Sequence, residues 1–440
     1  MTNEITKESL KQFDEDNNNN WTSLNAVANN GFLAASENKT TVNNNRAFSI
    51  ELKTKDVTDQ KRSGRCWMFA ALNSMRHDII KKSNLPQNFQ LSQSYTFFWD
   101  KLEKSNYFYN NIIATANKPL DDRKVSFLLE TPQQDGGQWD MICAIIEKYG
   151  IVPRTVMPET FNSANSDEIN TLLNKKLRKD AIQLRKLVKE ADDKEINKFK
   201  QAKLTEVYRI LVLAFGKPVE KFDFEYKDAD NNYHIDRNLT PKSFYDKYIG
   251  WNLQDYVSII NAPTSDKKYN HTYTVEFLGN VVGGRQVKHL NVDIEDFKKL
   301  AIKQLQDGQP VWFGCDVLQE SDRQLGIMDL NTYDKDNLLN INLSSMSKAE
   351  RLDYHESLMT HAMLLTGVDL VDGKPTKWKV ENSWGKKVGD KGYFVMSNEW
   401  LEEYCYQIVI RKDLLPNSLR KAQEEKPEML KPWDPMGALA

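Results

Sequence analysis

The hydrophobic positions of this chain follow a helical period over most of its length and a strand-like pattern in its last third. Apolar residues recur every three to four positions in stretches beginning at Cys66 and covering 91–104, 135–150, 195–215 and 294–306, which predicts helices. Short apolar or alternating segments predict strands at 47–52, 310–315, 361–368, 377–382, 392–396 and 406–411. The pattern therefore predicts an α+β fold, with a helical half facing a sheet or barrel half.

The segment from about 153 to 290 has a different character, with long charged helical patterns and polar loops. Leu173, Leu177, Leu184 and Val188 recur at helical spacing. Between residues 174 and 203 there are 11 Lys and Arg against 5 Asp and Glu. Such a run is usually a solvated helix face, and nucleic-acid binding is the less favoured alternative. We interpret this block as an inserted subdomain.

The ends of the chain are polar and differ in stiffness. Residues 1 to about 40 predict a polar helical arm, broken by four asparagines at 17–20 that we interpret as a loose surface turn. The tail at 426–440 carries three prolines and one tryptophan. A disordered terminus is the simpler interpretation. Docking of this stiff, aromatic tail onto the protein is the alternative.

Composition narrows the class of protein. The 440 residues are 40% hydrophobic and 28% charged, which is typical of a globular protein with more than one core unit. The net charge of −2 gives no general argument for nucleic acid or anionic membranes. There is no apolar run of transmembrane length and no secretory signal. The four cysteines form no CxxC pair and no zinc-like cluster, so we expect a cytoplasmic protein with reduced thiols, without metal or cofactor.

Cys66 is the first candidate for chemistry, because it stands where the turn Ser63–Gly64–Arg65 becomes an apolar helix. The free N–H groups at a helix start favour a thiolate, and the thiolate is the nucleophilic form. The same N–H groups can bind an oxyanion, and the side-chain amide of Gln60 is near enough in sequence to be a second donor. An inert buried thiol remains the alternative for Cys66. For Cys143, in the middle of the helix at 135–150, a core residue is the favoured interpretation.

A thiolate needs a base, and the base needs an orienting group. His361 begins an apolar strand, so its ring would project from a rigid edge. Asn382 lies 21 residues later on the next predicted strand, where it could fix the imidazole tautomer. Trp384 could cover that hydrogen bond from water. A histidine at a strand start is usually structural, but the combination with Cys66 favours catalysis.

The pair Gly136–Gly137 precedes the helix at 135–150. Two glycines at this position would let an extended peptide approach the backbone closely. A plain turn is the more frequent cause of such a pair, and both interpretations stay open at this point.

The motifs SGRCW around Cys66 and ENSWG around Asn382, in the order Gln60, Cys66, His361, Asn382, resemble the papain-like cysteine peptidases. Cys66 and His361 are 295 residues apart, about twice the 130–150 usual in that family, so roughly 150 residues are inserted. Five longer stretches are similar to the aminopeptidase C branch of the bleomycin hydrolases: QKRSGRCWMFAALN, FFWDKLEKSNYF, ESLMTHAMLLTGV, KWKVENSWG and PWDPMGALA.

This resemblance implies a papain-like fold and a division of the chain. It implies an N-terminal arm at 1–45, a helical half at 46–152, a helical oligomerisation insertion at 153–290, a β half at 291–415 and a C-terminal arm at 416–440 lying in the active-site cleft. It further implies Cys66 as nucleophile, His361 as general base and acid, Asn382 as its orienter, and Gln60 as an oxyanion donor. Gly136, Gly137, Trp384 and Ala440 would contact the substrate.

The resemblance also implies a cytoplasmic homohexamer that removes N-terminal residues from peptides through a thioester acyl-enzyme. In this picture the carboxylate of Ala440 meets the free α-amine of the substrate. Three alternatives remain: an endopeptidase or oligopeptidase of the same family, a hexamer that binds nucleic acid through the Lys-rich insertion, and a catalytically inactive scaffold. The last is disfavoured because every catalytic position is filled.

Overall fold

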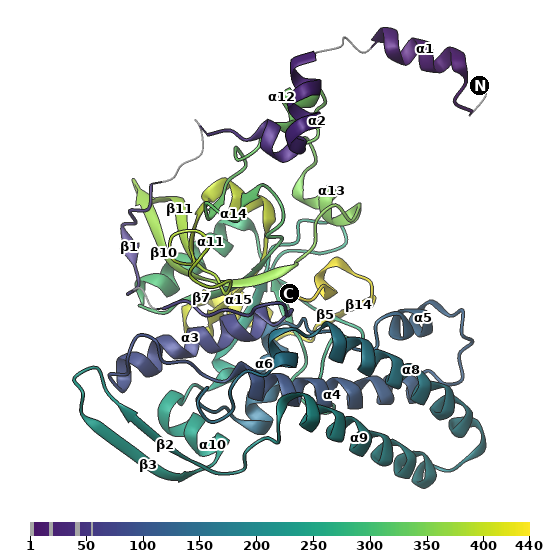
Figure 1. The fold of residues 1–440 in the computed structure, drawn as a ribbon, viewed down its shortest axis with the longest axis vertical. Helices are drawn as coiled ribbons and strands as arrows, with labels where there is room; N and C mark the ends of the chain where they lie inside the picture. The colour runs from purple at the N-terminus through teal and green to yellow at the C-terminus, as the bar shows by residue number, and fades with distance from the viewer. Residues whose placement is uncertain (1–3, 17–20, 40–44, 54–55) are drawn as a thin grey trace.

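A computed structural model describes residues 4–16, 21–39, 45–53 and 56–440 of the chain. A mixed β-sheet with helices on its outer face lies against a layer of long helices, which confirms the predicted α+β fold (Figure 1). No helix in the described ranges is long and apolar enough to cross a membrane.

Three helices form the layer under the sheet: α3 (Cys66–Lys82), α4 (Gln93–Ala114) and α6 (Trp139–Tyr149). The first turns of α3 are buried on every side, as its apolar composition requires. Ser92 caps α4, because its side chain accepts a hydrogen bond from the N–H of Tyr95. Gly150 ends α6 with a φ of 72°, a conformation that glycine adopts without strain. These two residues therefore set the start of α4 and the end of α6.

The main sheet follows the order β14-β5-β6-β4-β13-β7-β10-β11-β12-β9-β8, with β1 on the edge of β10. Strand β10 lies at its centre, where His361 is paired with Cys315 of β7. Ala362 and Leu364 pack toward the helical layer, whereas Met363 and Leu365 join the apolar core on the other face. The strands are β1 (Ile50–Glu51), β4 (Tyr256–Ile260), β5 (His271–Val275), β6 (His289–Asn291), β7 (Val311–Cys315), β8 (Ser321–Asp322), β9 (Ile327–Met328), β10 (His361–Val371), β11 (Lys374–Glu381), β12 (Tyr393–Ser397), β13 (Cys405–Arg411) and β14 (Glu428–Leu430).

Helices also cover the outer face and the ends of the sheet. Helix α11 (Ile294–Gln306) has the predicted bounds, and α14 (Asn398–Tyr404) and α15 (Asn417–Glu424) pack beside it. The shorter helices are α5 (Arg123–Glu130), α7 (Phe161–Ala164), α10 (Pro241–Phe244), α12 (Lys335–Leu339) and α13 (Lys348–Asp353). The strand predicted at 47–52 is shorter than expected, because only Ile50 and Glu51 pair with β10.

The charged middle block contains α8 (Asp167–Glu190) and α9 (Asp193–Phe215), which run side by side along α4 (Figure 1). A hairpin of β2 (Phe222–Lys227) and β3 (Tyr233–Leu239) follows and projects from the body. Strands β4 and β5 also lie within 153–290, and β6 ends one residue beyond it, yet all three belong to the main sheet. The division of the chain at 153 and 290 stays a prediction. Only about the first half of this block consists mainly of long helices.

The two ends of the chain lie in different environments. Helices α1 (Lys7–Asp16) and α2 (Trp21–Ser36) extend away from the body, and the asparagine run at 17–20 lies outside the described residues (Figure 1). The C-terminal segment instead returns to the centre of the molecule, where β14 adds to β5 as a parallel edge strand. A disordered tail, the simpler of the two predictions for this segment, is wrong. The Pro- and Trp-rich sequence is held by pairing and packing.

Candidate active site

Cys66 lies at the first position of α3 and is 2% exposed. Arg65 precedes the helix, and its side chain accepts no hydrogen bond from the first N–H groups of α3. The guanidinium of Arg65 instead binds both carboxylate oxygens of Glu159, at 3.1 and 2.8 Å. This buried ion pair holds the turn that presents the thiol.

His361, the predicted general base, hydrogen-bonds the residue predicted to orient it. Its Nε2 lies 2.9 Å from Oδ1 of Asn382, which follows directly after the end of β11. The N–H of Ser383 donates to the same Oδ1 at 2.7 Å, so this atom is the amide oxygen. Nε2 of His361 must therefore carry the proton, which leaves Nδ1 free to accept one. The ring of Trp384 stacks on the imidazole, with the ring centroids 4.7 Å apart.

Cys66 begins helix α3 and His361 begins strand β10, and these two elements pack against each other. The backbone at Ala362, the residue after His361, hydrogen-bonds the Cys66 thiol. The indole N–H of Trp312 on β7 donates to the backbone oxygen of Trp67 at 3.2 Å, which ties the helix start to the sheet. Cys66 and His361 are thus positioned by two rigid elements that lie far apart in the sequence.

Gln60 lies beside this pair and is held from both ends of its amide. Its Nε2 donates to the backbone oxygen of Ser63 at 2.7 Å, and its Oε1 accepts from the hydroxyl of Ser383 at 2.6 Å. Because an amide nitrogen carries two hydrogens, one N–H remains for a developing oxyanion. The same Ser383 that fixes the Asn382 oxygen therefore also fixes Gln60.

The other side of the cleft is formed by Gly136 and Gly137, against which the end of the chain lies. Gly137 N–H donates to the backbone oxygen of Ala440 at 3.1 Å, and Ala440 N–H donates to Gly137 O at 3.2 Å. A Cβ on Gly136 would lie 2.8 Å from that Ala440 oxygen, and one on Gly137 would lie 2.6 Å from the indole of Trp67. The close approach of the chain end requires a glycine at position 136, whereas the packed indole of Trp67 requires one at position 137.

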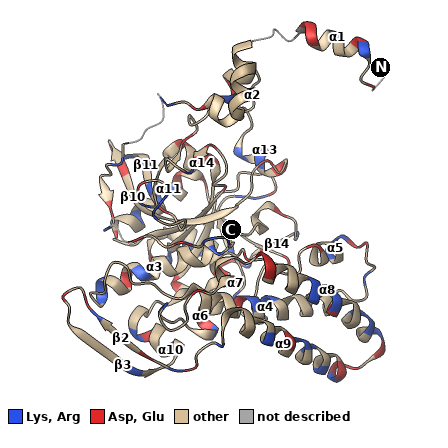
Figure 2. Cartoon of the chain, viewed as in Figure 1, with Lys and Arg blue, Asp and Glu red and all other residues tan. Residues whose placement is uncertain are grey.

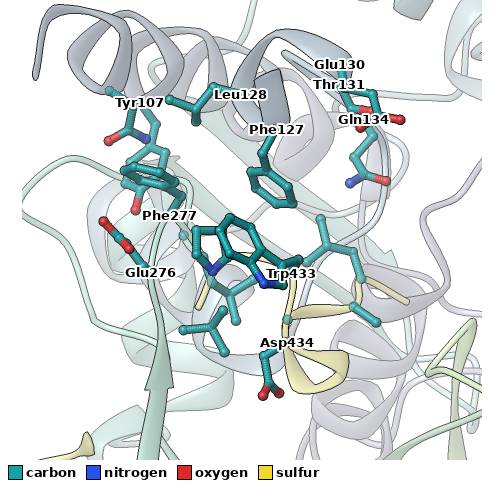
Figure 3. Close-up of a pocket in the computed structure, with 18 of the residues that line it drawn as sticks. Tyr107, Phe127, Leu128, Glu130, Thr131, Gln134, Glu276, Phe277, Trp433 and Asp434 are labelled. Atoms are coloured by element: carbon teal, nitrogen blue, oxygen red, sulfur yellow. The ribbon is translucent and has the colours of Figure 1, made fainter. Parts of the chain in front are cut away.

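Several contacts hold this C-terminal arm, residues 416–440, in place. Gln138 Nε2 donates to the backbone oxygens of Met436 and Ala438 at 3.0 and 2.8 Å. The buried Lys267 ammonium lies 2.9 Å from the Asp434 carboxylate. Figure 3 shows Trp433 beside a cavity of about 340 Å³, facing Phe127 of α5. The guanidinium of Arg123 lies 3.7 Å from the centroid of the Trp433 ring.

Comparison with known proteins identifies the family. A model of the Peptidase C1-like family matches residues 1–437. The chain belongs to the Peptidase C1-like family. It is 54% identical to an aminopeptidase C of Lactobacillus helveticus over 100% of this chain and 99% of that one, and 56% identical to one of Lactococcus lactis subsp. lactis over 94% of each. It superposes with TM-score 0.98 on the crystal structure of PepW from Lactobacillus rhamnosis, at 62% identity and full coverage of both chains.

In this C1-like peptidase the charge state of the catalytic pair is set by burial. Burial raises the pKa of the Cys66 thiol to about 11, with hydrogen bonds at Ala362 and Trp67 acting in the opposite direction. Burial lowers the pKa of the His361 imidazole to about 4, against the bond to Asn382, and the nearby Arg323 cation lowers it further. Each group alone is therefore neutral with the arm in the cleft. Transfer of the thiol proton to Nδ1 creates both charges together, so that each stabilises the other.

Asp135 is a residue of the peptidase site that the sequence interpretation missed. Its carboxylate accepts from the N–H of Gly64 at 3.0 Å and from Asn170 at 2.8 Å, and lies 2.8 Å from the Lys101 ammonium. Although burial alone would raise its pKa, Lys101 and these donors hold the pKa of Asp135 well below its usual range. The backbone oxygen of Asp135 also accepts from the indole of Trp67 at 2.9 Å. Its position directly before the two glycines was the signal that could have identified it.

Proposed function

We propose that the chain is a cysteine aminopeptidase that removes N-terminal residues from short peptides. Cys66 attacks the first peptide carbonyl while Nδ1 of His361 takes the thiol proton. The imidazolium, held by Asn382, then gives a proton to the leaving amine, and a thioester acyl-enzyme remains for water to hydrolyse. The N–H of Cys66 and the free N–H of Gln60 bind the oxyanion.

The observation that carries this proposal is the pairing of Ala440 with Gly137. The arm occupies the side of the cleft where an extended peptide would continue beyond its N-terminal residue. The Ala440 oxygen that accepts from Gly137 N–H belongs to its carboxylate, whose other oxygen would meet the α-ammonium of a substrate. A blocked substrate would leave that buried charge without an ammonium partner at a high cost. The aminopeptidase names of relatives that cover nearly the whole chain support the same activity.

The test compares an amino-acid arylamide with its N-acetylated form. We expect the free form to be hydrolysed and the acetylated form to be rejected. Deleting residues 438–440 should admit the acetylated substrate, whereas Ala440→Ser, which keeps the carboxylate, should still reject it. Preference of the intact enzyme for the acetylated form would overturn the aminopeptidase and favour the endopeptidase alternative.

The nucleophile is tested separately. Cys66→Ala should abolish hydrolysis while the thermal unfolding midpoint stays close to that of the wild type, because alanine fits the buried helix start. Hydrolysis retained by this variant would contradict the mechanism.

We further propose a homohexamer acting in the cytoplasm, where the four cysteines, all free in the structure, would stay reduced. Helix α2 supports self-association, because Trp21, Leu24, Phe32 and Leu33 on it are between 50% and 68% exposed. A native mass near that of one subunit would contradict the hexamer.

Nucleic-acid binding through the Lys-rich helices receives less support. Figure 2 shows acidic residues interspersed with the basic ones along α8 and α9. Lys176 pairs with Asp180 and Glu206, and Arg178 binds backbone oxygens at 129 and 130. Gel shifts that disappear at higher salt, and on removal of the charges at Lys175, Lys176, Arg178 and Lys179, would favour this second function.

A further inference from the structure

Arg323 is an exposed cation one aromatic ring away from the catalytic histidine. It lies in the turn between β8 and β9, with its guanidinium carbon 4.4 Å from the centroid of the Trp384 ring. The same Trp384 ring also stacks on the imidazole of His361, with the two ring centroids 4.7 Å apart. The positive charge is close enough to act on the imidazole.

The turn that carries Arg323 is fixed in place. Asp322 accepts hydrogen bonds from the N–H groups of Gln324 and Leu325, both at 2.8 Å. Arg46 crosses to this turn and donates to the backbone oxygen of Leu325 at 2.7 Å. The guanidinium of Arg323 is therefore presented by an ordered backbone, and only its side chain has freedom to adapt.

Arg323 differs from the other cations on this wall of the cleft. The ammonium of Lys61 lies 2.6 Å from the carboxylate of Asp59, whose backbone forms a β-bridge with Trp384. The ammonium of Lys386 lies 2.9 Å from the carboxylate of Asp56. Both lysines thus have a carboxylate of their own. Within the described part of the chain, no ion pair or hydrogen bond engages the guanidinium of Arg323. A planar cation with five donors is left facing solvent beside the reacting groups.

The position of the arm decides which part of a substrate reaches Arg323. If the chain is the aminopeptidase proposed above, the residue to be removed lies between Ala440 and Cys66. The remainder of the peptide, which leaves as the amine, must then extend away from the arm and past His361. The wall on that side carries Trp384, with Arg323 stacked on it.

We infer that Arg323 binds the C-terminal carboxylate of short peptide substrates on the leaving-group side of the cleft. A guanidinium matches a carboxylate through two parallel hydrogen bonds, a geometry that an amide end cannot provide. Because an extended residue spans about 3.3–3.6 Å, the carboxylates of dipeptides to tetrapeptides lie within the region that this long, exposed side chain can reach. The residue would make the enzyme favour short peptides with a free C-terminus.

The experiment measures kcat/KM for a tripeptide with a free C-terminus and for the same tripeptide as its C-terminal amide. We expect the wild type to prefer the free acid by about fivefold, the range of an exposed charge pair. Arg323→Gln should bring this ratio close to one, and Arg323→Glu should invert it. Raising the salt concentration should reduce the wild-type preference, because both charges are exposed.

Two variants control for a general loss of positive charge. Lys386→Gln removes a cation from the same wall that already has a partner, and Arg209→Gln removes an exposed cation on α9. Both should keep the wild-type ratio. A ratio that falls equally in Lys386→Gln would overturn the assignment to Arg323.

The failure of this inference is distinct from failure of the aminopeptidase. A wild-type ratio of kcat/KM near one would overturn the role of Arg323. So would an Arg323→Gln variant whose kcat/KM falls equally for the free acid and the amide, because loss of the contact with Trp384 alone would have that effect. Absence of hydrolysis of every unblocked substrate by the wild type would instead overturn the proposed function.

Discussion

Ala440 and Gly137 are joined by two backbone hydrogen bonds, 3.2 Å from the Ala440 N–H and 3.1 Å to its backbone oxygen. The end of the chain thus pairs with Gly137 as an extended strand would. The adjacent Gly136 contacts the same arm, whereas Gly137 also packs against Trp67, the neighbour of Cys66. This difference allows the arm and the nucleophile to be perturbed separately.

Adding a methyl group at each glycine should have different effects. Gly137→Ala places its Cβ 2.6 Å from the rigid indole of Trp67, so we expect a loss of about 1–3 kcal/mol in the free energy of unfolding and lower activity on all substrates. Gly136→Ala meets Leu439 and Ala440 at 2.8 Å, so we expect the arm to shift and acetylated arylamides to be cleaved. Denaturant unfolding and the two arylamide assays distinguish the variants. Equal behaviour of the two would argue against this separation.

Removing the hydrogen bond to the imidazole should slow the chemistry. Asn382→Ala leaves Nε2 of His361 without its acceptor, so the ring loses its fixed tautomer and we expect kcat to fall by roughly 100-fold. Asn382→Asp, which keeps an acceptor for His361 and for Ser383 N–H, should lose less. The rate of Cys66 alkylation gives an independent readout, because it depends on proton transfer to His361. An unchanged alkylation rate in Asn382→Ala would contradict the orienting role.

The ion pair between Lys267 and Asp434 should act as a latch for the arm. Lys267→Met removes the ammonium partner of the Asp434 carboxylate, whose side chain is 9% exposed. Breaking such a buried pair costs about 3–5 kcal/mol. We expect the arm to detach in part and acetylated substrates to be hydrolysed. Adding Asp434→Asn, whose amide oxygen can still accept from Met436 N–H, should restore their rejection. A double variant as permissive as the single one would contradict the latch.

Buried neutral histidines should make stability fall in mild acid. Burial lowers the pKa of His289 from 6.5 to about 4, and it lowers that of His361 equally. Between pH 4 and 6.5 the unfolded chain binds more protons at these histidines than the folded chain does. The free energy of unfolding therefore decreases as the pH falls from about 6.5 toward 4, and these groups do not affect it above that range. His289→Asn, which keeps an acceptor for the Ser258 hydroxyl at the Nδ1 position, should decrease less between pH 6.5 and 5 in urea unfolding. An equal decrease would assign the acid sensitivity to other groups.

Much of the site was predictable from local sequence. The thiol at a helix start and the histidine at a strand start depend on backbone patterns that the hydrophobic periodicity displays directly. The motif around Asn382 likewise predicted the side chain that hydrogen-bonds His361 and placed Trp384, which stacks on the imidazole, beside it. The caps at Ser92 and Gly150 are local too, because a cap contacts only residues within a turn.

The rest required the tertiary structure, because it depends on contacts between segments remote in sequence. The residues next to Asp135 in the sequence do not indicate that its carboxylate contacts Gly64, Lys101 and Asn170. Nothing local in Arg323 shows that it lies over Trp384 without a carboxylate partner in the described chain. The sequence by itself determined which residues can do the chemistry. Only the fold decided that the end of the chain lies against Gly136 and Gly137 and that the Arg323 cation lies over Trp384, since long-range packing sets both positions.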